Sequence, residues 1–264
     1  VNFDRKSGQT DLSDLKNKLS DDVSAVIVGY PNFFGIIEDL REIREAIPEN
    51  VMMIVSANPT ALAILRAPGK LGADIVVGEG QPLGNPPYLG GPGFGFFASK
   101  EAYIRKMPGR IIGETKDGEG RTGYVMVLQT REQHIRRNKA TSNICSNQAF
   151  NVLLASIYMS LVGPKGLQEI ARRSYDKAHY LAKRIEKMDK VRPVFTGPFF
   201  SEFVVEFKKD LSSLNSKLLK DKILGPLDLG EFRDDMKNHG LICLTEANRN
   251  EEIEFFAGRL EELE

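Results

Sequence analysis

Residues 51–80 read VMMIVSANPTALAILRAPGKLGADIVVGEG, and this stretch decides the fold class. Its two ends, 51–57 and 73–80, are short β-branched runs of the kind found in buried strands. Between them, 60–67 has helical spacing, with Thr60 as the expected N-cap. Strand, helix and strand in this order predict a βαβ unit, and therefore an α/β fold with a parallel sheet.

The same pattern extends upstream. Residues 23–29 (VSAVIVG) predict another buried strand, and 36–47 (IIEDLREIREAI) predict an amphipathic helix that ends before Pro48. Parallel strands joined by helices need right-handed connections, and helices normally cover both faces of such a sheet. We therefore expect a parallel sheet that is buried on both sides.

Downstream, the sequence predicts a change of architecture after a strongly apolar helix. Residues 147–162 (NQAFNVLLASIYMSLV) should form that helix and be buried on most of its surface, and 167–188 predict a long amphipathic helix. The remaining segments indicate a small α+β domain. The other elements expected are extended segments at 94–99, 121–130, 199–207 and 241–246, a helix at 212–222 and a terminal helix at 251–264.

Composition excludes several classes of function. The 264 residues balance 36 Lys and Arg against 36 Asp and Glu, so no net field attracts nucleic acid or an anionic membrane. No apolar run approaches the roughly 18–20 residues that span a bilayer. Cys145 and Cys243 lack metal-ligand or CxxC spacing, which predicts buried or half-buried thiols, a reducing compartment and a cytoplasmic location. The first residue is Val1 instead of methionine, so we expect a fragment or a processed product.

Few motifs carry chemistry by themselves. The glycine cluster at 90–95 matches neither a dinucleotide fingerprint nor a P-loop, and no metal-ligand cluster or nucleophile arrangement is present. His179 lies on the charged helix and is expected to be solvated. The segment 131–143 (REQHIRRNKATSN) places His134 and four basic residues beside hydroxyl groups, just before the apolar helix. It is either an anion site or an ordinary N-cap with a solvated basic flank.

Three long strings resemble one family: PNFFGIIEDL, GADIVVGEGQPLGNPPYLGGPGFGFFASK and TREQHIRRNKATSNICSNQAFNVLLASIY. They are similar to the first subunit of the two-chain glycine dehydrogenase (decarboxylating), the P-protein of the glycine cleavage system. The resemblance covers essentially the whole chain and lacks only the N-terminal portion of the family. It implies the pyridoxal-phosphate-dependent transferase fold (aspartate aminotransferase-like, fold type I). Residues 1–146 would be the latter part of the large domain, and 147–264 the linking helices and the small C-terminal α+β domain.

The resemblance also implies which positions would carry the cofactor chemistry. Counting back from the glycine cluster places Gln81 where catalytic relatives have the lysine that forms the Schiff base. Asn58 follows the second strand, where the acid that pairs with the pyridine nitrogen is expected. Gln81 cannot form an imine, and a neutral amide cannot stabilise a pyridinium as a carboxylate can. The chain is therefore expected to have the fold but no catalytic residue of its own.

The resemblance further implies a heterotetrameric complex. A lysine-bearing P-protein subunit would hold pyridoxal phosphate, decarboxylate glycine and pass the aminomethyl group to the lipoyl-carrying H-protein. This chain would complete the site at the interface. The residues expected to reach the partner's phosphate are Thr141, Ser142 and Asn143, and those expected to form a positive wall are His134, Arg136, Arg137 and Lys139.

Two other functions remain open from the sequence. The chain could be a self-sufficient pyridoxal phosphate enzyme that uses Lys70, Lys100 or Lys139. It could also be a non-enzymatic scaffold that self-associates to cover an exposed sheet edge and apolar surface.

Overall fold

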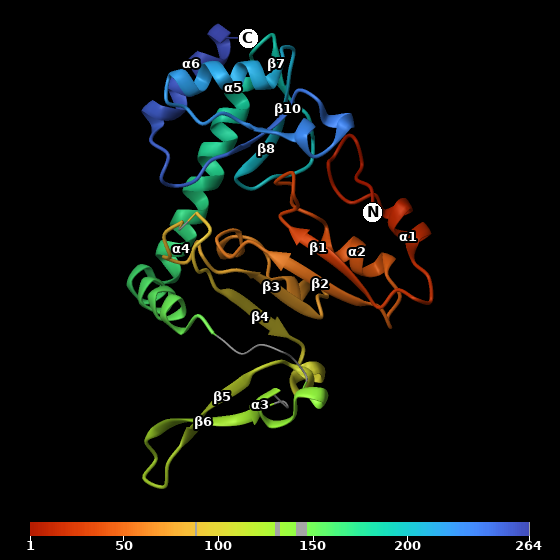
Figure 1. The fold of residues 1–264 in the computed structure, drawn as a ribbon, viewed down its shortest axis with the longest axis vertical. Coiled ribbons are helices and arrows are strands. Elements are labelled where there is room, and N and C mark those ends of the chain that lie inside the picture. The colour runs from red at the N-terminus through yellow and green to blue at the C-terminus, as the bar shows by residue number, and fades with distance from the viewer. Residues whose placement is uncertain (88, 130–132, 141–146, 264) are drawn as a thin grey trace.

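The computed structural model describes residues 1–87, 89–129, 133–140 and 147–263, apart from the side chains of 134 and 135 (Figure 1). Its helices are α1 Leu12–Lys18, α2 Leu40–Ala46, α3 Gln133–Arg136, α4 Ala149–Ile185, α5 Leu211–Lys220 and α6 Asn250–Leu263. Its strands are β1 Ala25–Tyr30, β2 Met52–Ala57, β3 Ile75–Glu79, β4 Gly95–Ser99, β5 Arg110–Lys116, β6 Thr122–Gln129, β7 Val191–Pro193, β8 Glu202–Phe207, β9 Leu227–Asp228 and β10 His239–Cys243. Its 3-10 turns are η1 Ala61–Ala63, η2 Pro68–Leu71, η3 Glu101–Lys106, η4 Arg137–Lys139, η5 Leu229–Glu231 and η6 Asp234–Met236.

The first sheet has the strand order β1-β2-β3-β4. β1, β2 and β3 run parallel, with Val28 opposite Val55 and Val55 opposite Val76, whereas β4 pairs antiparallel with β3. The parallel sheet and its three strands predicted from the sequence are confirmed. Because β1, β2 and β3 share one direction, the residues that follow them gather at one edge of the sheet.

One face of this sheet is buried and the other is not. Val28, Met53 and Val55 pack under α1 and α2, whereas Ile27 is 71% exposed and Phe97 is 45% exposed on the opposite face. Successive residues of a strand point to opposite faces, so the two sets are fixed by register. The prediction that both faces are covered is wrong for this chain, because no described helix packs over Ile27 and Phe97.

The segment after β2 is not the short α-helix predicted at 60–67. It forms the single 3-10 turns η1 and η2, with Ile64 to Ala67 between them. Thr60 makes no capping bond; instead, the Asn58 side-chain oxygen accepts from the backbone N–H groups of Thr60 and Ala61. A helix this short closes few hydrogen bonds, so an asparagine turn that satisfies the same donors competes successfully.

α4 combines both predicted helices and bends at Gly163, which has φ 62°. Its second half is buried in the C-terminal domain through Ala178 and Ile185, whereas Ala171 packs against Ala61 of η1 and Phe200. Its first half is largely exposed, with Phe150 at 68% and Leu161 at 81%. The prediction that 147–162 is buried on most of its surface is therefore wrong. Apolar composition shows which side chains of a helix can be buried, but they are buried only where another part of the protein packs against them.

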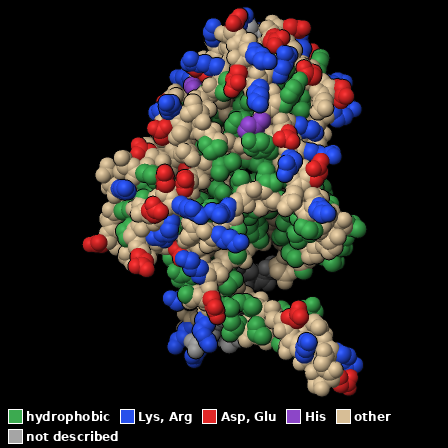
Figure 2. All heavy atoms as spheres, turned by 180° about the vertical axis from the view of Figure 1, so that it is seen from behind, with side chains coloured by type: hydrophobic (Ala, Val, Ile, Leu, Met, Phe, Trp, Pro, Cys, Tyr) green, Lys and Arg blue, Asp and Glu red, His purple; other side chains and the backbone are tan. Residues whose placement is uncertain are grey.

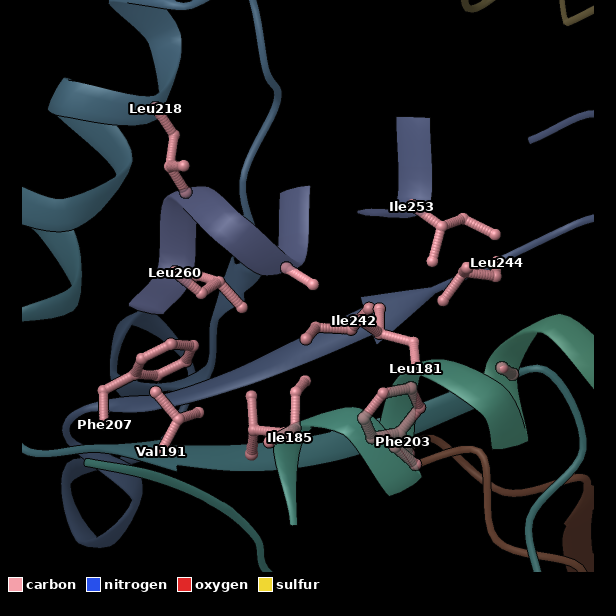
Figure 3. Close-up of a cluster of buried hydrophobic side chains, with 14 of the residues drawn as sticks. Leu181, Ile185, Val191, Phe203, Phe207, Leu218, Ile242, Leu244, Ile253 and Leu260 are labelled. Atoms are coloured by element: carbon pink, nitrogen blue, oxygen red, sulfur yellow. The ribbon is translucent and has the colours of Figure 1, made fainter. Parts of the chain in front are cut away.

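The C-terminal domain has its own sheet, in the order β7-β8-β10-β9, covered by α4, α5 and α6. Figure 3 shows its core, in which Leu181 and Ile185 of α4 meet Phe203, Ile242 and Leu260. Each such side chain contributes roughly 1.5–3 kcal/mol on burial. The strands and helices predicted for this region are confirmed, with ends shifted by a few residues. The division of the chain at 146/147 stays a prediction.

β5 and β6 form a separate two-stranded sheet that projects from the body beyond β4 (Figure 1). The sequence predicted only an extended segment at 121–130, and its partner β5 was missed.

Two regions far apart in sequence meet above the carboxyl ends of the parallel strands. The N-terminal segment pairs with the turn before β8, since Thr196 N–H donates to the Lys6 carbonyl at 2.8 Å. Ile37 N–H donates to the Pro198 carbonyl at 2.7 Å. The C-terminal domain is thus fixed directly over the edge of the sheet where the predicted site residues lie.

Candidate functional site

The site expected from the sequence lies at the carboxyl ends of β1, β2 and β3. An amide residue follows each strand: Asn32 after β1, Asn58 after β2 and Gln81 after β3. In open α/β sheets this edge is where ligands bind. The structure therefore brings the predicted positions Asn58 and Gln81 to the ends of neighbouring strands, with Asn32 beside them.

Gln81 is half-buried and bonded to its own loop. Its side-chain amide donates to the Asn85 carbonyl, and its backbone N–H donates to the Glu79 carboxylate at 3.0 Å. The loop is closed further by Gly80 N–H, which donates to the Phe94 carbonyl at 2.7 Å. The side chain at the expected lysine position thus stabilises the turn through a hydrogen bond, and it has no amine.

Asn58 is used in the same way. Its N–H donates to the Tyr30 carbonyl at 3.0 Å, which ties the ends of β1 and β2 together. Its side-chain oxygen accepts from Thr60 N–H at 2.9 Å and from Ala61 N–H at 3.3 Å. A neutral amide whose oxygen is engaged by the backbone cannot stabilise a pyridinium as a carboxylate would.

Asn32 and Glu38 are the functional-looking pair that sequence reasoning did not single out. Asn32 Nδ2 donates to Glu38 Oε1 at 2.8 Å and to the Gly8 carbonyl at 2.9 Å. Glu38 is only 6% exposed and also accepts from the N–H and hydroxyl of Thr10. Glu38 lies just before α2, and its side chain is buried and has a structural role. It fixes the N-terminal segment over the end of β1.

The glycine- and proline-rich loop is held against the first half of α4. Asn85 is 4% exposed and Asn151 is 3% exposed. Asn85 Nδ2 donates to the Asn151 carbonyl at 3.2 Å, and Asn151 Nδ2 donates to the Pro92 carbonyl at 2.6 Å. These two amides fix the loop that carries Gln81 at both of its ends.

The alternative lysines do not replace the missing amine. Lys100 follows β4, which runs antiparallel, so it lies at the opposite edge of the sheet, where its Nζ is 2.7 Å from Asp74 Oδ1. Lys70 is exposed in η2, ahead of β3. Lys139 is exposed in η4. In the described part of the chain, the residues at the carboxyl edge do not fit a Schiff-base site.

The predicted anion segment is described only in part. Arg136, Arg137 and Lys139 are exposed, on α3 and η4. The side chain of His134 lies outside the described residues, as do all of Thr141, Ser142 and Asn143. The choice between an anion site and a solvated basic flank therefore stays open.

The remaining histidine and cysteine positions have structural surroundings. His179 is not solvated as expected: its ring stacks between Tyr175 at 3.8 Å and Phe199 at 3.9 Å between centroids. Part of Cys243 is exposed, whereas burial of its thiol and the neighbouring Glu202 carboxylate raise its pKa to about 12. Cys145 lies outside the described residues. No group of three or more metal-ligating side chains occurs in the described ranges.

Comparison with known proteins gives a consistent result. The family model for the glycine cleavage system P-protein matches residues 4–258. The probable glycine dehydrogenase (decarboxylating) subunit 1 of Bacillus cytotoxicus is 48% identical over 255 residues, which are 96% of this chain and 57% of that protein. The chain thus spans little more than half the length of such a relative.

Solved structures agree with the fold. The crystal structure of inhibitor-bound glycine decarboxylase (P-protein) of the glycine cleavage system matches with a TM-score of 0.85 and 38% identity, over 94% of this chain and 56% of that chain. A C-DES mutant with glycine covalently linked to its pyridoxal phosphate matches with a TM-score of 0.63 and 15% identity, over 97% of this chain and 65% of that one. The second likeness concerns the fold alone. The predicted fold, that of pyridoxal-phosphate-dependent enzymes of fold type I, is confirmed, and the chain belongs to the glycine cleavage system P-protein family.

Proposed function

We propose that this chain is the subunit of a two-subunit glycine decarboxylase that does not bear the cofactor lysine. It would complete an interface active site in which the partner subunit decarboxylates glycine and transfers the aminomethyl group to a lipoyl-carrying H-protein. The main support is Gln81, an amide bonded to its own loop at the position expected for the lysine. The name "subunit 1" of the relatives supports the existence of a second subunit.

Pyridoxal phosphate would be held by the partner, where it supplies the electron sink for loss of the carboxylate. The role of this chain is then to shape and close the site. The amides at the carboxyl edge hold three loops in place, and the buried pair Asn85 and Asn151 holds the loop of Gln81 on α4. We propose that this loop preserves the interface surface although no lysine is present.

A positive wall at the site would attract an anion. Arg136, Arg137 and Lys139 are exposed and, in the described part of the chain, form no ion pair. Together with His134 they would face the partner's phosphate or an acidic surface of the H-protein. The contact of Thr141, Ser142 and Asn143 with the phosphate and the heterotetramer stay predictions from the resemblance. The cytoplasmic location stays a prediction from the cysteine usage.

The test is reconstitution. The chain and a lysine-bearing P-protein subunit would be purified separately, and exchange of the glycine carboxyl group with bicarbonate would be measured for each alone and for the mixture. We expect exchange only in the mixture. Exchange by this chain alone, or equal exchange by the partner without it, would rule out the proposed role.

Variants locate the positive wall. Arg136→Ala combined with Arg137→Ala should reduce exchange by the mixture at least tenfold, because two charges facing an anion are lost. Arg172→Ala, which removes an exposed cation from the second half of α4, is the control and should change exchange less than twofold. Equal effects of the two changes would argue against a localised wall.

A further inference from the structure

Asn151 is the residue at which α4 meets the glycine- and proline-rich loop, of which the structure describes 81–87 and 89–93. In this described part, both hydrogen bonds that join the loop to α4 involve Asn151. Its Nδ2 donates to the Pro92 carbonyl at 2.6 Å, and its backbone carbonyl accepts from Asn85 Nδ2 at 3.2 Å. One bond reaches the first part of the loop and the other reaches the last part. The path of the loop along α4 therefore depends on this one residue.

The helix itself gives no reason for an asparagine at this position. The first half of α4 is otherwise rich in apolar residues, and Figure 2 shows hydrophobic side chains over this part of the helix. Asparagine is a weaker helix former than the alanine and leucine residues around it. Asn151 is also only 3% exposed, so its amide is not there to meet solvent. Because an apolar side chain would suit the helix better, the amide is explained by its bonds to the loop.

The first turn of the loop is held by its own hydrogen bonds, and the outer part needs support from outside. Asn85 N–H donates to the Gln81 carbonyl at 3.1 Å, and the Gln81 side-chain amide donates to the Asn85 carbonyl. Leu89 and Gly90 then follow with φ angles of 52° and 103°. The left-handed region is unfavourable for a residue with a side chain, and such a conformation persists only where the surroundings hold it. Asn151, which is bonded on both sides of this stretch, supplies that restraint.

Stability alone does not account for the two buried amides. Asn85 is 4% exposed, and its Oδ1 is buried with no hydrogen-bond partner among the described residues. Burying an acceptor without a donor is unfavourable. Two apolar side chains of similar size would avoid this cost, but they would not bond the loop to the helix. What the pair of Asn85 and Asn151 supplies is therefore a defined path for the loop.

We propose that Asn151 is a positioning residue for the decarboxylation of glycine at the interface site. It acts through the glycine- and proline-rich loop, which begins at Gln81 on the carboxyl edge of the sheet, and it fixes the surface that this chain presents to the partner's reacting groups. This inference rests on the proposed function and adds to it the residue that sets the geometry of the site. A misplacement of about 1 Å in an active site can reduce turnover about a hundredfold, even when the changed residue touches no reacting atom.

The first variant, Asn151→Leu, removes the side-chain donor and keeps a similar volume. It would be assayed in the mixture with the lysine-bearing subunit, with this chain at a saturating concentration. The kcat for exchange of the glycine carboxyl group with bicarbonate should fall at least tenfold. The KM for glycine should change less than twofold, because the partner binds glycine and only the surface around it moves. Gln168→Leu, the same kind of change at an exposed position of α4, is the control and should change kcat less than twofold.

The second variant, Asn151→Asp, replaces the amide by a group whose hydrogen bonding changes with pH. When protonated, the carboxyl can donate to the Pro92 carbonyl as the amide does; when ionised, it cannot donate. A carboxyl at this buried position should have a raised pKa, because burial disfavours the charged form. The kcat of the mixture that contains this variant should be at least tenfold below that of the unmodified mixture at pH 8, and within threefold of it at pH 6.

Hydrogen–deuterium exchange of the full chain without the partner measures the restraint on the loop directly. In Asn151→Leu, peptides from the loop should exchange at least fivefold faster than in the unmodified chain. Peptides from β1 and β2 should not change, which shows that the variant is folded. Asn151→Asp should show the same loosening at pH 8 and exchange like the unmodified chain at pH 6. Unchanged exchange of the loop in Asn151→Leu would overturn the inference.

The two measurements separate this inference from the proposed function. An active unmodified mixture in which Asn151→Leu and Gln168→Leu have equal kcat would reject the positioning role and leave the function standing. A loss of kcat that more of the variant chain restores, or no recovery of Asn151→Asp at pH 6, would also reject that role. An unmodified mixture that shows no exchange would reject the function, and a faster exchanging loop in Asn151→Leu would then still support the restraint that Asn151 places on the loop.

Discussion

The side-chain amide of Gln81 donates a hydrogen bond to the backbone carbonyl of Asn85, four residues further along the chain. Asn85 is itself bonded to α4 through the Asn151 carbonyl. A side chain at the end of a parallel strand, where a ligand would be reached, is thus turned back to hold a loop. The residue at the position expected for the lysine thus has a structural use.

Introducing an amine at position 81 should not by itself create a cofactor site. Gln81→Lys, mixed with pyridoxal phosphate and reduced with borohydride, is expected to give no more lysine adduct at position 81 than at other exposed lysines. The reason is that Asn58 provides no carboxylate for the pyridine nitrogen and its oxygen is engaged by Thr60 and Ala61. Peptide mapping by mass spectrometry measures the adduct. Selective, stoichiometric labelling of residue 81 would show that the site still accepts the cofactor.

Gly35 should be among the least replaceable residues of the chain. Its φ is 80°, and an added Cβ would lie 2.0 Å from the Glu202 carbonyl oxygen at the junction between the two sheets. Gly35→Ala is expected to destabilise the protein by more than about 2 kcal/mol, because strain and overlap add. Urea unfolding measures this loss. Gly258→Ala, in α6 with open space around it, is the control and should stabilise slightly.

The central sheet could be predicted from the sequence because each of its parallel strands is indicated by its own short run of apolar residues. The β-branched runs at 51–57 and 73–80 become β2 and β3 with small shifts at their ends. β5, by contrast, reads RIIGETK, and its charges and glycine interrupt the apolar pattern that predicts a strand. It forms a strand because it pairs with β6. The prediction of a short helix at 60–67 was wrong because the side-chain oxygen of Asn58 forms a turn that satisfies the same backbone donors.

For the candidate site, the sequence could supply only positions along the chain, and the roles of those positions stay predictions. The resemblance located Gln81 and Asn58, and the structure places both at the ends of neighbouring strands. The hydrogen-bond partners of each side chain depend on the path of the backbone around it. The spacing of residues in the sequence does not predict that path. Burial of the first half of α4 was wrong for a different reason: the sequence describes one chain, and a helix face can be apolar because of a surface outside it.

Asp74 should make stability depend on pH in the acid range. Burial alone would raise the pKa of Asp74, but hydrogen bonds from Lys100 and Met53 N–H and the charge of Arg44 lower it overall. An acid whose pKa is lower in the folded state stabilises the fold at pH values above its unfolded-state pKa of about 3.9. This stabilisation is lost as the pH falls through the folded-state pKa. Asp74→Asn should therefore cost about 1–3 kcal/mol at pH 7, where charged hydrogen bonds are lost. In urea unfolding, the difference from the unmodified chain should shrink below about pH 4; a constant difference would contradict the assignment.

His179 should make the stability of the protein depend on pH a second time, closer to neutral pH. Here the group is a base whose pKa is lowered by burial, whereas Asp74 is an acid whose pKa is lowered by hydrogen bonds and nearby charges. Burial between Tyr175 and Phe199 lowers the pKa of His179; the Tyr175 carbonyl, which bonds Nδ1 at 2.9 Å, opposes this change, and the charge of Lys183 reinforces it. Since the folded state binds the proton less readily than the unfolded chain, stability is complete above the unfolded pKa of about 6.5 and falls as the pH drops below it. The loss levels off once the pH is below the folded pKa.

The variant His179→Phe tests this dependence, because an aromatic ring can keep the stack but cannot titrate. Urea unfolding at intervals between pH 5 and pH 8 should show a smaller slope of stability against pH for this variant than for the unmodified chain. The stack joins α4 to the turn before β8, so the variant should remain folded at pH 8, where His179 is neutral in both states. An unchanged slope would mean that the stacked ring is not the group that titrates in this range, and that protonation does not weaken the contact between α4 and Phe199.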